Sequence, residues 1–333
     1  MTRFRLEPRD EYPHQAGSER NFNESVYSNA FDRTTGLGGW MRIGNRPNEG
    51  HAELSVCLYL PDGRIACQFQ RPAIDGNSGF HAGGLGVEVL EPLRSIRMGY
   101  DGELLLLPGP EPLRDPPTMI ATATRVEGAV QWRHEGVSPV HGGMPIGPRQ
   151  QTAYGRRFSR AHFNQHTRVT GSVRVGGQSW SFDGYGWRDH SWGPRHWQNV
   201  HWYRLFIVAF GPDRGFMLLK ITDRRGKTLR TGVLLVDGEY EEVLDLDVVT
   251  SWSTSSEPRA VSIGVRTARR REIITGRVVC TAPLRNRRRE RGNVLESRIA
   301  ESMTDFEWNG QVARGMTEYI ERIEDGALAG YPL

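Results

Sequence analysis

The sequence has almost no lysine and no large excess of either charge. All but two of its 43 basic residues are arginine, the exceptions being Lys220 and Lys227, and 39 acidic residues leave a net charge of only +4. The arginine runs Arg269–Arg271 and Arg285–Arg291 lack the interleaved aromatic residues that single-strand nucleic-acid binders use. We interpret these runs as solvated loops and the arginine excess as a coding bias, and we expect no nucleic-acid partner.

Cysteine is scarce, and long apolar runs are absent. The three cysteines form no CxxC pair, so neither a disulfide framework nor a zinc cluster is favoured, and Cys57 and Cys67 are typical of small buried strand residues. The longest apolar stretches, Leu104–Leu107 and Leu205–Phe210, are far shorter than the roughly 20 residues of a membrane span. The first residues are charged and give no secretory signal. The sequence therefore predicts a cytoplasmic protein without a membrane span.

Motifs for cofactors and metals are also missing. Neither Gly36–Gly39 nor Gly83–Gly86 completes a strand, GxGxxG and helix unit, and no GxxxxGK[ST] loop occurs. His190, His196 and His201 are separated by six and five residues, a spacing that fits neither a helical HExxH face nor alternate positions of one strand. We expect neither a nucleotide cofactor nor a metal.

Glycine, by contrast, is abundant and recurs in turn dipeptides. Most of these dipeptides separate stretches of alternating apolar and polar residues, and they occur at Asp62-Gly63, Asp75-Gly76, Asp101-Gly102, Gly176-Gly177, Asp183-Gly184, Asp237-Gly238 and Asn309-Gly310. They supply the positive backbone angles of two-residue hairpins. No stretch shows a 3.6-residue apolar period with caps at both ends. We predict an all-β fold of antiparallel strands with few, short helices.

The length of 333 residues corresponds to about two domains. A hairpin around Gly176-Gly177 closes one unit and an apolar strand from Tyr203 to Phe210 opens another, so we predict domains at 1–187 and 188–333. Five of the nine tryptophans fall near this boundary, at Trp180, Trp187, Trp192, Trp197 and Trp202. Because ligand sites concentrate in clefts between domains, this cluster is the first candidate for a functional site.

The densest group of functional side chains, between residues 184 and 197, places Asp189 and His190 among indoles and arginines. Burying such groups is costly unless each has a partner. One interpretation is proton transfer: an apolar environment raises the pKa of a carboxyl group, so Asp189 acts as general acid and His190 as its relay or base. The alternative is structural, with Asp189 paired to Arg188 or Arg195 as a lock at the domain junction.

Other polar residues have two interpretations each. His162, Asn164, Gln165 and His166 form either a polar wall of the same cleft or ordinary strand positions. Three carboxylates flank the Asn309-Gly310 turn, and they either point inward or lie on a solvated face; they are Glu301, Asp305 and Glu318. A serine-hydrolase site at Ser191 is disfavoured because no GxSxG elbow surrounds it.

The segment around Asp189-His190-Ser191-Trp192-Gly193 resembles a motif of the two-domain, lipocalin-like superfamily that includes carotenoid 1,2-hydratase (hydroxyneurosporene synthase) and the yeast survival-factor proteins. Hydratases of that group carry Asp-His-Asn-Trp-Gly, so Ser191 stands in place of asparagine. With Ser191, Arg188 and Pro194-Arg195, the motif resembles a separate bacterial branch of the superfamily more than it resembles the carotenoid hydratases themselves. Weaker similarity covers most of the chain, at Glu24-Ser25-Val26-Tyr27, Pro61-Asp62-Gly63, Gln165-His166, Gly171, Glu301, Trp308-Asn309-Gly310 and Glu318.

The resemblance implies two lipocalin-like β-barrel or sandwich lobes with an apolar small-molecule ligand between or inside them. Known activities in the superfamily include hydration of an isoprenoid alkene, dehydration, isomerisation and ring closure, none of which needs a metal or nucleotide. By this analogy Asp189, with His190, protonates an alkene or activates an allylic hydroxyl, and indoles stabilise the cation. The substrate-binding residues are then Trp187, Trp192, Trp197, Arg188, Arg195, His166, Tyr27, Glu24, Glu301 and Glu318.

The sequence thus predicts a cofactor-independent hydro-lyase or isomerase acting on a terpenoid, steroid-like or polycyclic substrate at the junction of two β lobes. The rival prediction is a non-catalytic carrier of lipids or isoprenoids, in which the Asp189 segment only locks the lobes together.

Overall fold

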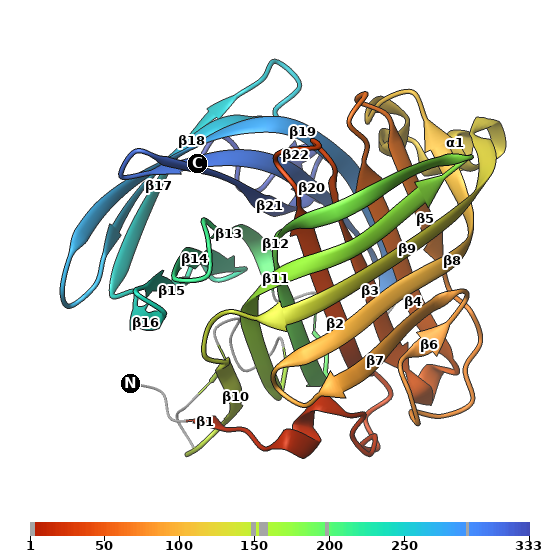
Figure 1. Ribbon diagram of the computed structural model, residues 1–333, viewed down its shortest axis with the longest axis horizontal. Coiled ribbons are helices and arrows are strands. Elements are labelled where there is room, and N and C mark those ends of the chain that lie inside the picture. The colour runs from red at the N-terminus through yellow and green to blue at the C-terminus, as the bar shows by residue number, and fades with distance from the viewer. Residues whose placement is uncertain (1–3, 148–150, 153–158, 197–199, 291–292) are drawn as a thin grey trace. The chain divides into compact units, whose positions relative to one another are not determined.

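The computed structural model describes residues 4–147, 151–152, 159–196, 200–290 and 293–333. The chain separates into two compact units, one formed by residues 1–106 and 124–197 and the other by residues 107–123 and 198–333. In both units nearly all secondary structure is β-strand (Figure 1). The predicted all-β fold is confirmed, whereas the predicted domain boundaries, 1–187 and 188–333, stay a prediction.

The first unit holds a single large antiparallel sheet. Its strands are β1 (Phe4–Arg5), β2 (Phe22–Phe31), β3 (Gly38–Arg46), β4 (His51–Tyr59), β5 (Ile65–Gln70), β6 (His81–Ala82), β7 (Leu85–Glu91), β8 (Ser95–Leu107), β9 (Thr124–Gly136), β10 (His141–Pro145), β11 (Ala161–Val175) and β12 (Gln178–Pro194). β9 pairs with both β11 and β8, so the path through β12, β2, β3, β4 and β5 returns on itself as a ring of strands. The ring encloses one hydrophobic cluster.

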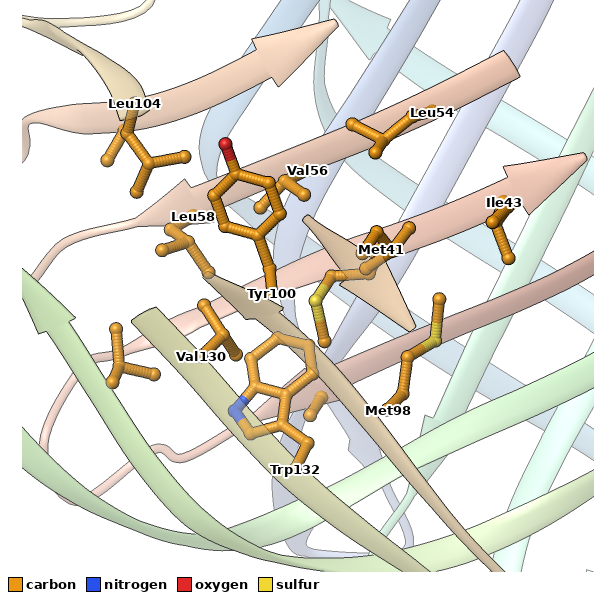
Figure 2. Close-up of a cluster of buried hydrophobic side chains, with 14 of the residues drawn as sticks. Met41, Ile43, Leu54, Val56, Leu58, Met98, Tyr100, Leu104, Val130 and Trp132 are labelled. Atoms are coloured by element: carbon orange, nitrogen blue, oxygen red, sulfur yellow. The ribbon is translucent and has the colours of Figure 1, made fainter. Parts of the chain in front are cut away.

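That cluster is built by alternate residues of the strands, because successive side chains point to opposite faces of a sheet. Figure 2 shows Met41, Val56, Met98 and Trp132 converging within it. These side chains are completely buried. Each such residue stabilises the unit by about 1.5–3 kcal/mol relative to an exposed position, so the cluster fixes which face of each strand turns inward.

The second unit holds another antiparallel sheet. Its strands are β13 (Val200–Ala209), β14 (Arg214–Asp223), β15 (Thr228–Val236), β16 (Glu239–Glu242), β17 (Asp245–Trp252), β18 (Pro258–Arg266), β19 (Arg271–Glu290), β20 (Asn293–Trp308), β21 (Gln311–Glu324) and β22 (Ala327–Leu328). The order is β16-β15-β14-β13-β21-β20-β19-β18-β17, with β22 beside β21. Phe206, Ile263 and Phe306 belong to its separate hydrophobic cluster. The continuous apolar strand predicted after Tyr203 is β13, almost entirely buried.

Helices are few and short in the described residues, as predicted. They are the 3₁₀ turns η1 (Pro8–Glu11), η2 (Pro47–Glu49) and η3 (Glu111–Arg114) and the single α-helix α1 (Pro116–Thr122). Among the described residues, no helix has the length and apolar character needed to cross a membrane. Cys57 and Cys67 are paired in register across β4 and β5 as buried thiols that no disulfide joins, and burial raises the pKa of Cys67 to about 12.

Most of the predicted turn dipeptides do connect strands. Gly176-Gly177 joins β11 to β12, Asp237-Gly238 joins β15 to β16, and Asn309-Gly310 joins β20 to β21, each with positive φ at both residues. Asp62-Gly63 lies between β4 and β5. Both positions at positive φ match the type I′ turn that suits the twist of a hairpin.

Two predicted turns are wrong, because both dipeptides lie inside long strands. Asp101-Gly102 is part of β8 and Asp183-Gly184 is part of β12. In β12 glycine is required by close packing instead: a Cβ at Gly184 would lie 2.2 Å from the carbonyl oxygen of Phe31, and one at Gly186 would lie 1.9 Å from that of Asn29. The glycines here mark the close approach of β12 to β2 rather than a chain reversal.

Candidate functional site

Strand β12 carries most of the predicted site residues and sorts them onto two faces of the sheet. It pairs with β11 and β2 without a register shift. Its even-numbered residues share a face with Val26 and Phe182 of the hydrophobic cluster, which we call the core face. Its odd-numbered residues lie on the opposite face, which we call the polar face. Asp189 and His190 therefore point away from each other.

The polar face gathers side chains from neighbouring strands. By register its members around Asp189 are His162, Asn164 and His166 of β11, Trp187 and Ser191 of β12, Asn23, Ser25, Tyr27 and Asn29 of β2, and Trp40, Arg42 and Arg46 of β3. Most of them are buried although they do not face the hydrophobic cluster. The predicted residues Asp189, Trp187, His166 and Tyr27 are thus brought together, and the predicted polar wall of β11 lies beside them.

Asp189 lies next to an imidazole on this face. Its Oδ2 is 3.5 Å from Nε2 of His162, and its side chain is 16% exposed whereas that of His162 is buried. Opposite Asp189 on β2 is Tyr27, whose ring stacks on Trp40 with a centroid distance of 6.4 Å. A carboxyl, an imidazole and a phenol are groups that transfer protons. The imidazole beside Asp189 is His162 and not His190, and the catalytic roles of Asp189 and His190 stay predictions.

Several buried polar atoms of the polar face have no hydrogen-bond partner among the described residues. They are Nε1 of Trp40, Nε1 of Trp187, Nδ2 of Asn23 and Nη2 of Arg46. All four side chains are at most 3% exposed. Leaving such an atom unpaired costs about 1–3 kcal/mol, and native interiors contain few of them. Convergent polar groups of this kind, set among aromatic rings, are typical of a small-molecule site.

Arginine side chains also belong to this face and its surroundings. Nη2 of Arg195 donates to Oγ of Ser191 at 2.7 Å, and Arg42 forms an ion pair with Glu53. Burial lowers the pKa of Arg195 to about 9, an effect that the charge of Arg42 reinforces and that Asp189 opposes.

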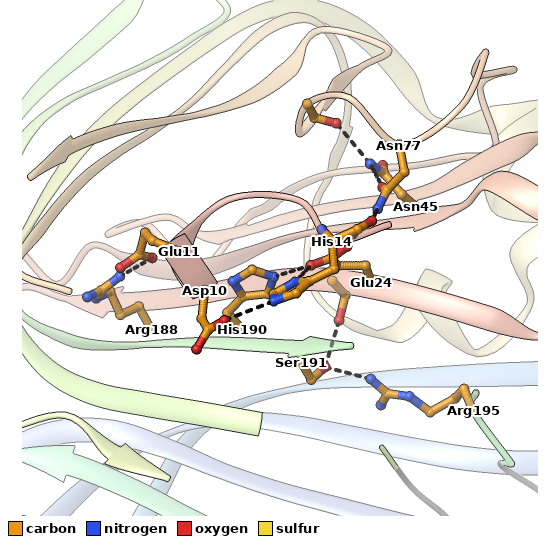
Figure 3. Close-up of polar contacts among 12 residues, drawn as sticks. Asp10, Glu11, His14, Glu24, Asn45, Asn77, Arg188, His190, Ser191 and Arg195 are labelled. Atoms are coloured by element: carbon orange, nitrogen blue, oxygen red, sulfur yellow. Dashed lines mark hydrogen bonds and ion pairs between the residues drawn. The ribbon is translucent and has the colours of Figure 1, made fainter. Parts of the chain in front are cut away.

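The core face of β12 carries a different cluster, which Figure 3 shows. Glu24 of β2 accepts at Oε1 from Nδ1 of His14 at 2.6 Å and from Nε2 of His190 at 2.9 Å. Its Oε2 accepts from the backbone N–H of His14 at 2.8 Å and from Nδ2 of Asn77 at 2.6 Å. The other ring nitrogen of His14 lies 3.3 Å from Oδ1 of Asp10.

Glu24 is completely inaccessible, yet it is ionised. Burial alone would raise its pKa, but the hydrogen bonds from His14 and His190 and their charge lower the pKa to about 2. For His14, burial acts to lower the pKa, and the contacts with Glu24 and Asp10 outweigh it so that the pKa is raised. These residues therefore form one coupled polar cluster in the first unit.

Arg188 also belongs to the core face. Its Nη1 donates to Glu11 at 2.6 Å and its Nε and Nη2 donate to Oε1 of Gln165 at 3.0 and 2.8 Å. Glu11 accepts in turn from the backbone N–H of Leu93 at 2.7 Å. Arg188 thus ties the N-terminal segment to β11 and β12 and is not paired with Asp189.

The remaining predicted residues lie elsewhere. Trp192 is on the core face and stacks on His14 with ring centroids 3.9 Å apart. Glu301 and Glu318 lie directly opposite each other on β20 and β21, in the second unit. Trp197 lies outside the described residues.

Sequence reasoning missed His14 entirely and did not connect it with Glu24. His14 precedes β2 in a segment without regular structure, so no period marks it. In β12, by contrast, the sequence itself shows that Asp189 and His190 are consecutive residues. Because successive side chains of a strand point to opposite faces of the sheet, the two residues lie on different faces.

A ring of antiparallel strands in one unit and a long antiparallel sheet in the other place the chain in the class of two-lobed, lipocalin-like all-β proteins. Residues 7–323 match the family described as "Domain of unknown function (DUF7064)", and the chain belongs to that family. No protein of curated function matches the sequence.

Solved structures of this fold extend over nearly the whole chain. A protein of Nitrosomonas europaea named as an AttH is 14% identical, with 92% of this chain and 94% of that chain covered and a TM-score of 0.60. CghA with Sch210972 is 11% identical, with coverage of 91% and 89% and a TM-score of 0.57. CghA alone is 10% identical, with coverage of 92% and 90% and a TM-score of 0.58. At these identities the likeness establishes the fold alone.

Proposed function

We propose that the protein is a cofactor-independent acid–base enzyme that hydrates, dehydrates or isomerises a carbon–carbon double bond of a small, largely apolar molecule at the polar face of β12. The observation that carries the proposal is the contact of Asp189 with His162. The carboxyl group of Asp189 is partly exposed, and nearby buried polar atoms have no hydrogen-bond partner among the described residues. The substrate class we infer is a terpenoid, steroid-like or polycyclic compound, in keeping with the resemblance of the Asp189 motif to carotenoid 1,2-hydratase.

The chemistry needs one group that delivers a proton and one that removes it. In hydration, a proton adds to one alkene carbon, water adds to the other, and the oxonium proton returns to a base; dehydration is the reverse. Asp189 and His162 supply an acid and a base within reach of each other, and the rings of Tyr27 and Trp187 stabilise positive charge on carbon. His190 is assigned no part in this step because it faces the other way.

The binding part of the proposal rests on the surrounding groups. The indole N–H of Trp40 and of Trp187 and the amide of Asn23 are buried donors that meet no acceptor in the ranges that the structure describes, so they suit hydroxyl or carbonyl oxygens of a ligand. The indole and phenol rings suit its apolar body. CghA, a protein of similar fold, has been solved with a small molecule, Sch210972.

Exchange with heavy water tests the proposal without knowledge of the product. The protein is incubated in deuterated water with a panel of terpenoid, steroid and polycyclic alkenes and the matching alcohols, and mass spectrometry follows deuterium and water incorporation. We expect Asp189→Asn to lower the rate about 10²–10⁴-fold. The matched control is Asp183→Asn on the same strand, an exposed residue paired with Arg168, which should react as the wild type does.

Two results contradict the proposal. A folded Asp189→Asn protein that reacts at the wild-type rate removes Asp189 from the chemistry. Panel compounds that bind to wild type and Asp189→Asn alike, without exchange in either, establish the carrier function instead.

A further inference from the structure

We propose that His14, Glu24 and His190 form a binding site for a divalent transition-metal ion, with Zn²⁺ as the preferred ion. The site lies on the core face, opposite Asp189, and does not depend on the function proposed above. It revises the expectation of no metal, which considered His190, His196 and His201 and not His14.

The three side chains already present their ligand atoms to one point. One ligand atom from each of His14, Glu24 and His190 lies within 4.8 Å of the other two, and Nδ1 of His14 and Nε2 of His190 are 2.6 and 2.9 Å from the same carboxylate oxygen, Oε1 of Glu24. Zinc binds imidazole nitrogen and carboxylate oxygen at about 2.0–2.2 Å, so two of its ligands are separated by about 3–3.5 Å. Shifts of less than about 1 Å in the side chains would lengthen the two nitrogen–oxygen distances to the separation of zinc ligands.

The contacts behind His14 and Glu24 are those that metal sites use, whereas Nδ1 of His190 has no hydrogen-bond partner among the described residues. A metal-bound histidine usually donates its second ring N–H to a carboxylate or carbonyl, and a ligating carboxylate is itself hydrogen-bonded. Nε2 of His14 meets Asp10, and Oε2 of Glu24 accepts from Asn77 and from the backbone. These contacts leave Oε1 of Glu24 as the atom on which both imidazoles converge.

Charge and surroundings also favour a dication. With neutral imidazoles, the carboxylates of Glu24 and Asp10 balance a charge of +2, whereas the nearby Glu11 is neutralised by Arg188. Phe80 and Phe163 pack their edges against His190, and Trp192 stacks on His14. Two nitrogens and one oxygen suit zinc better than the harder Mg²⁺ or Ca²⁺.

Metal binding would join parts of the chain that are distant in sequence. His14 belongs to the segment before β2, whereas Glu24 and His190 lie on β2 and β12. The side chain of His14 is 21% exposed, while Glu24 and His190 are buried, so the ion would enter from the side of His14. Three protein ligands leave a fourth position for water.

Metal content of the full chain tests the site. The protein is stripped with EDTA, equilibrated with ZnCl₂, passed through gel filtration and analysed for zinc by mass spectrometry. We expect one Zn²⁺ per chain and a higher melting temperature with zinc. His14→Ala and Glu24→Gln should each weaken zinc binding by at least about 10–100-fold, whereas His81→Ala, an exposed histidine, should leave it unchanged.

The measured zinc content distinguishes a metal site from a cluster held together by hydrogen bonds alone. Circular dichroism first establishes that each variant folds, and His14→Ala changes a residue outside the strands. Zinc far below one equivalent in the wild type, or equal zinc in wild type, His14→Ala and Glu24→Gln, overturns the proposal. Because Asp189 faces the other way, deuterium exchange at the polar face should persist in the EDTA-treated protein, so the two proposals fail separately.

Discussion

Neighbouring residues of β12 have opposite surroundings. On the core face, Arg188 and His190 are held by the buried carboxylates of Glu11 and Glu24. On the polar face, Asp189 lies 3.5 Å from the imidazole of His162, near buried polar atoms that have no hydrogen-bond partner within the described part of the chain. Closed polar networks fix a structure, whereas open ones are available to a ligand. From this comparison we propose that adjacent members of one motif have separate roles, His190 in holding the chain and the proposed metal, and Asp189 in substrate binding and chemistry.

The largest effect on stability is expected from the core face. Arg188→Met leaves Glu11 buried and without its cation, which should lower the free energy of unfolding by about 3–5 kcal/mol. Asp189→Asn should change it by less than about 1 kcal/mol. Urea unfolding of the two variants measures both values, and equal losses would remove the distinction between the faces.

The position of Gly186 gives a related prediction for the strand pair itself. A Cβ at residue 186 would lie 1.9 Å from the carbonyl oxygen of Asn29, so Gly186→Ala should destabilise the pairing of β12 with β2 by about 2–3 kcal/mol. Gly177→Ala serves as the control because a Cβ at residue 177 would have nothing within 4 Å. This control measures only the cost of placing alanine at a positive φ in the turn. A drop in the melting temperature no larger than that of the control would mean that β12 and β2 are less closely packed.

Much of this arrangement was predictable from the sequence, and the limits have physical causes. Turn dipeptides and alternation identified the all-β fold and the hairpin at Gly176-Gly177, because both are local signals. Residues of one strand, such as Trp187 and Asp189, were correctly placed in one segment. The pairing of β12 with β2 joins residues more than 150 positions apart, and no local pattern reveals it. The partners of Asp189 and Glu24 therefore came only from the fold.

A smaller loss of stability is expected from a substitution at Tyr27, which distinguishes a role in substrate binding from a role in folding on the polar face. Tyr27→Phe removes a hydroxyl that accepts from Nδ2 of Asn29 at 3.3 Å, and we expect a loss of about 0.5–1.5 kcal/mol in stability. If the phenol also contacts the substrate, deuterium exchange falls by much more than this small loss of stability explains. Loss of stability without any change in exchange would restrict Tyr27 to a structural role.

The smallest effect is expected in the second unit, which supplies a reference that belongs to neither cluster. Burial acts to raise the pKa of Glu241, but hydrogen bonds from Arg270 and Thr267 outweigh it and lower the pKa. Its stabilisation is therefore present above the unfolded pKa of about 4.3 and is lost as the pH falls through the lower folded value. Glu241→Gln should cost less than about 1 kcal/mol at neutral pH and flatten acid unfolding, with no change in exchange.

The central claim is that the organic substrate binds at the polar face of β12, opposite the metal site proposed on the core face. Two tryptophans five residues apart on this strand report on the two faces, because Trp187 lies on the polar face and Trp192 stacks on His14. The direct measurement is the ¹⁵N–¹H spectrum of the indole groups, recorded while the panel compound with the fastest exchange is added. The account predicts that the Trp187 and Trp40 signals shift and the Trp192 signal stays in place. A shift of Trp192 with Trp187 and Trp40 unchanged would contradict it.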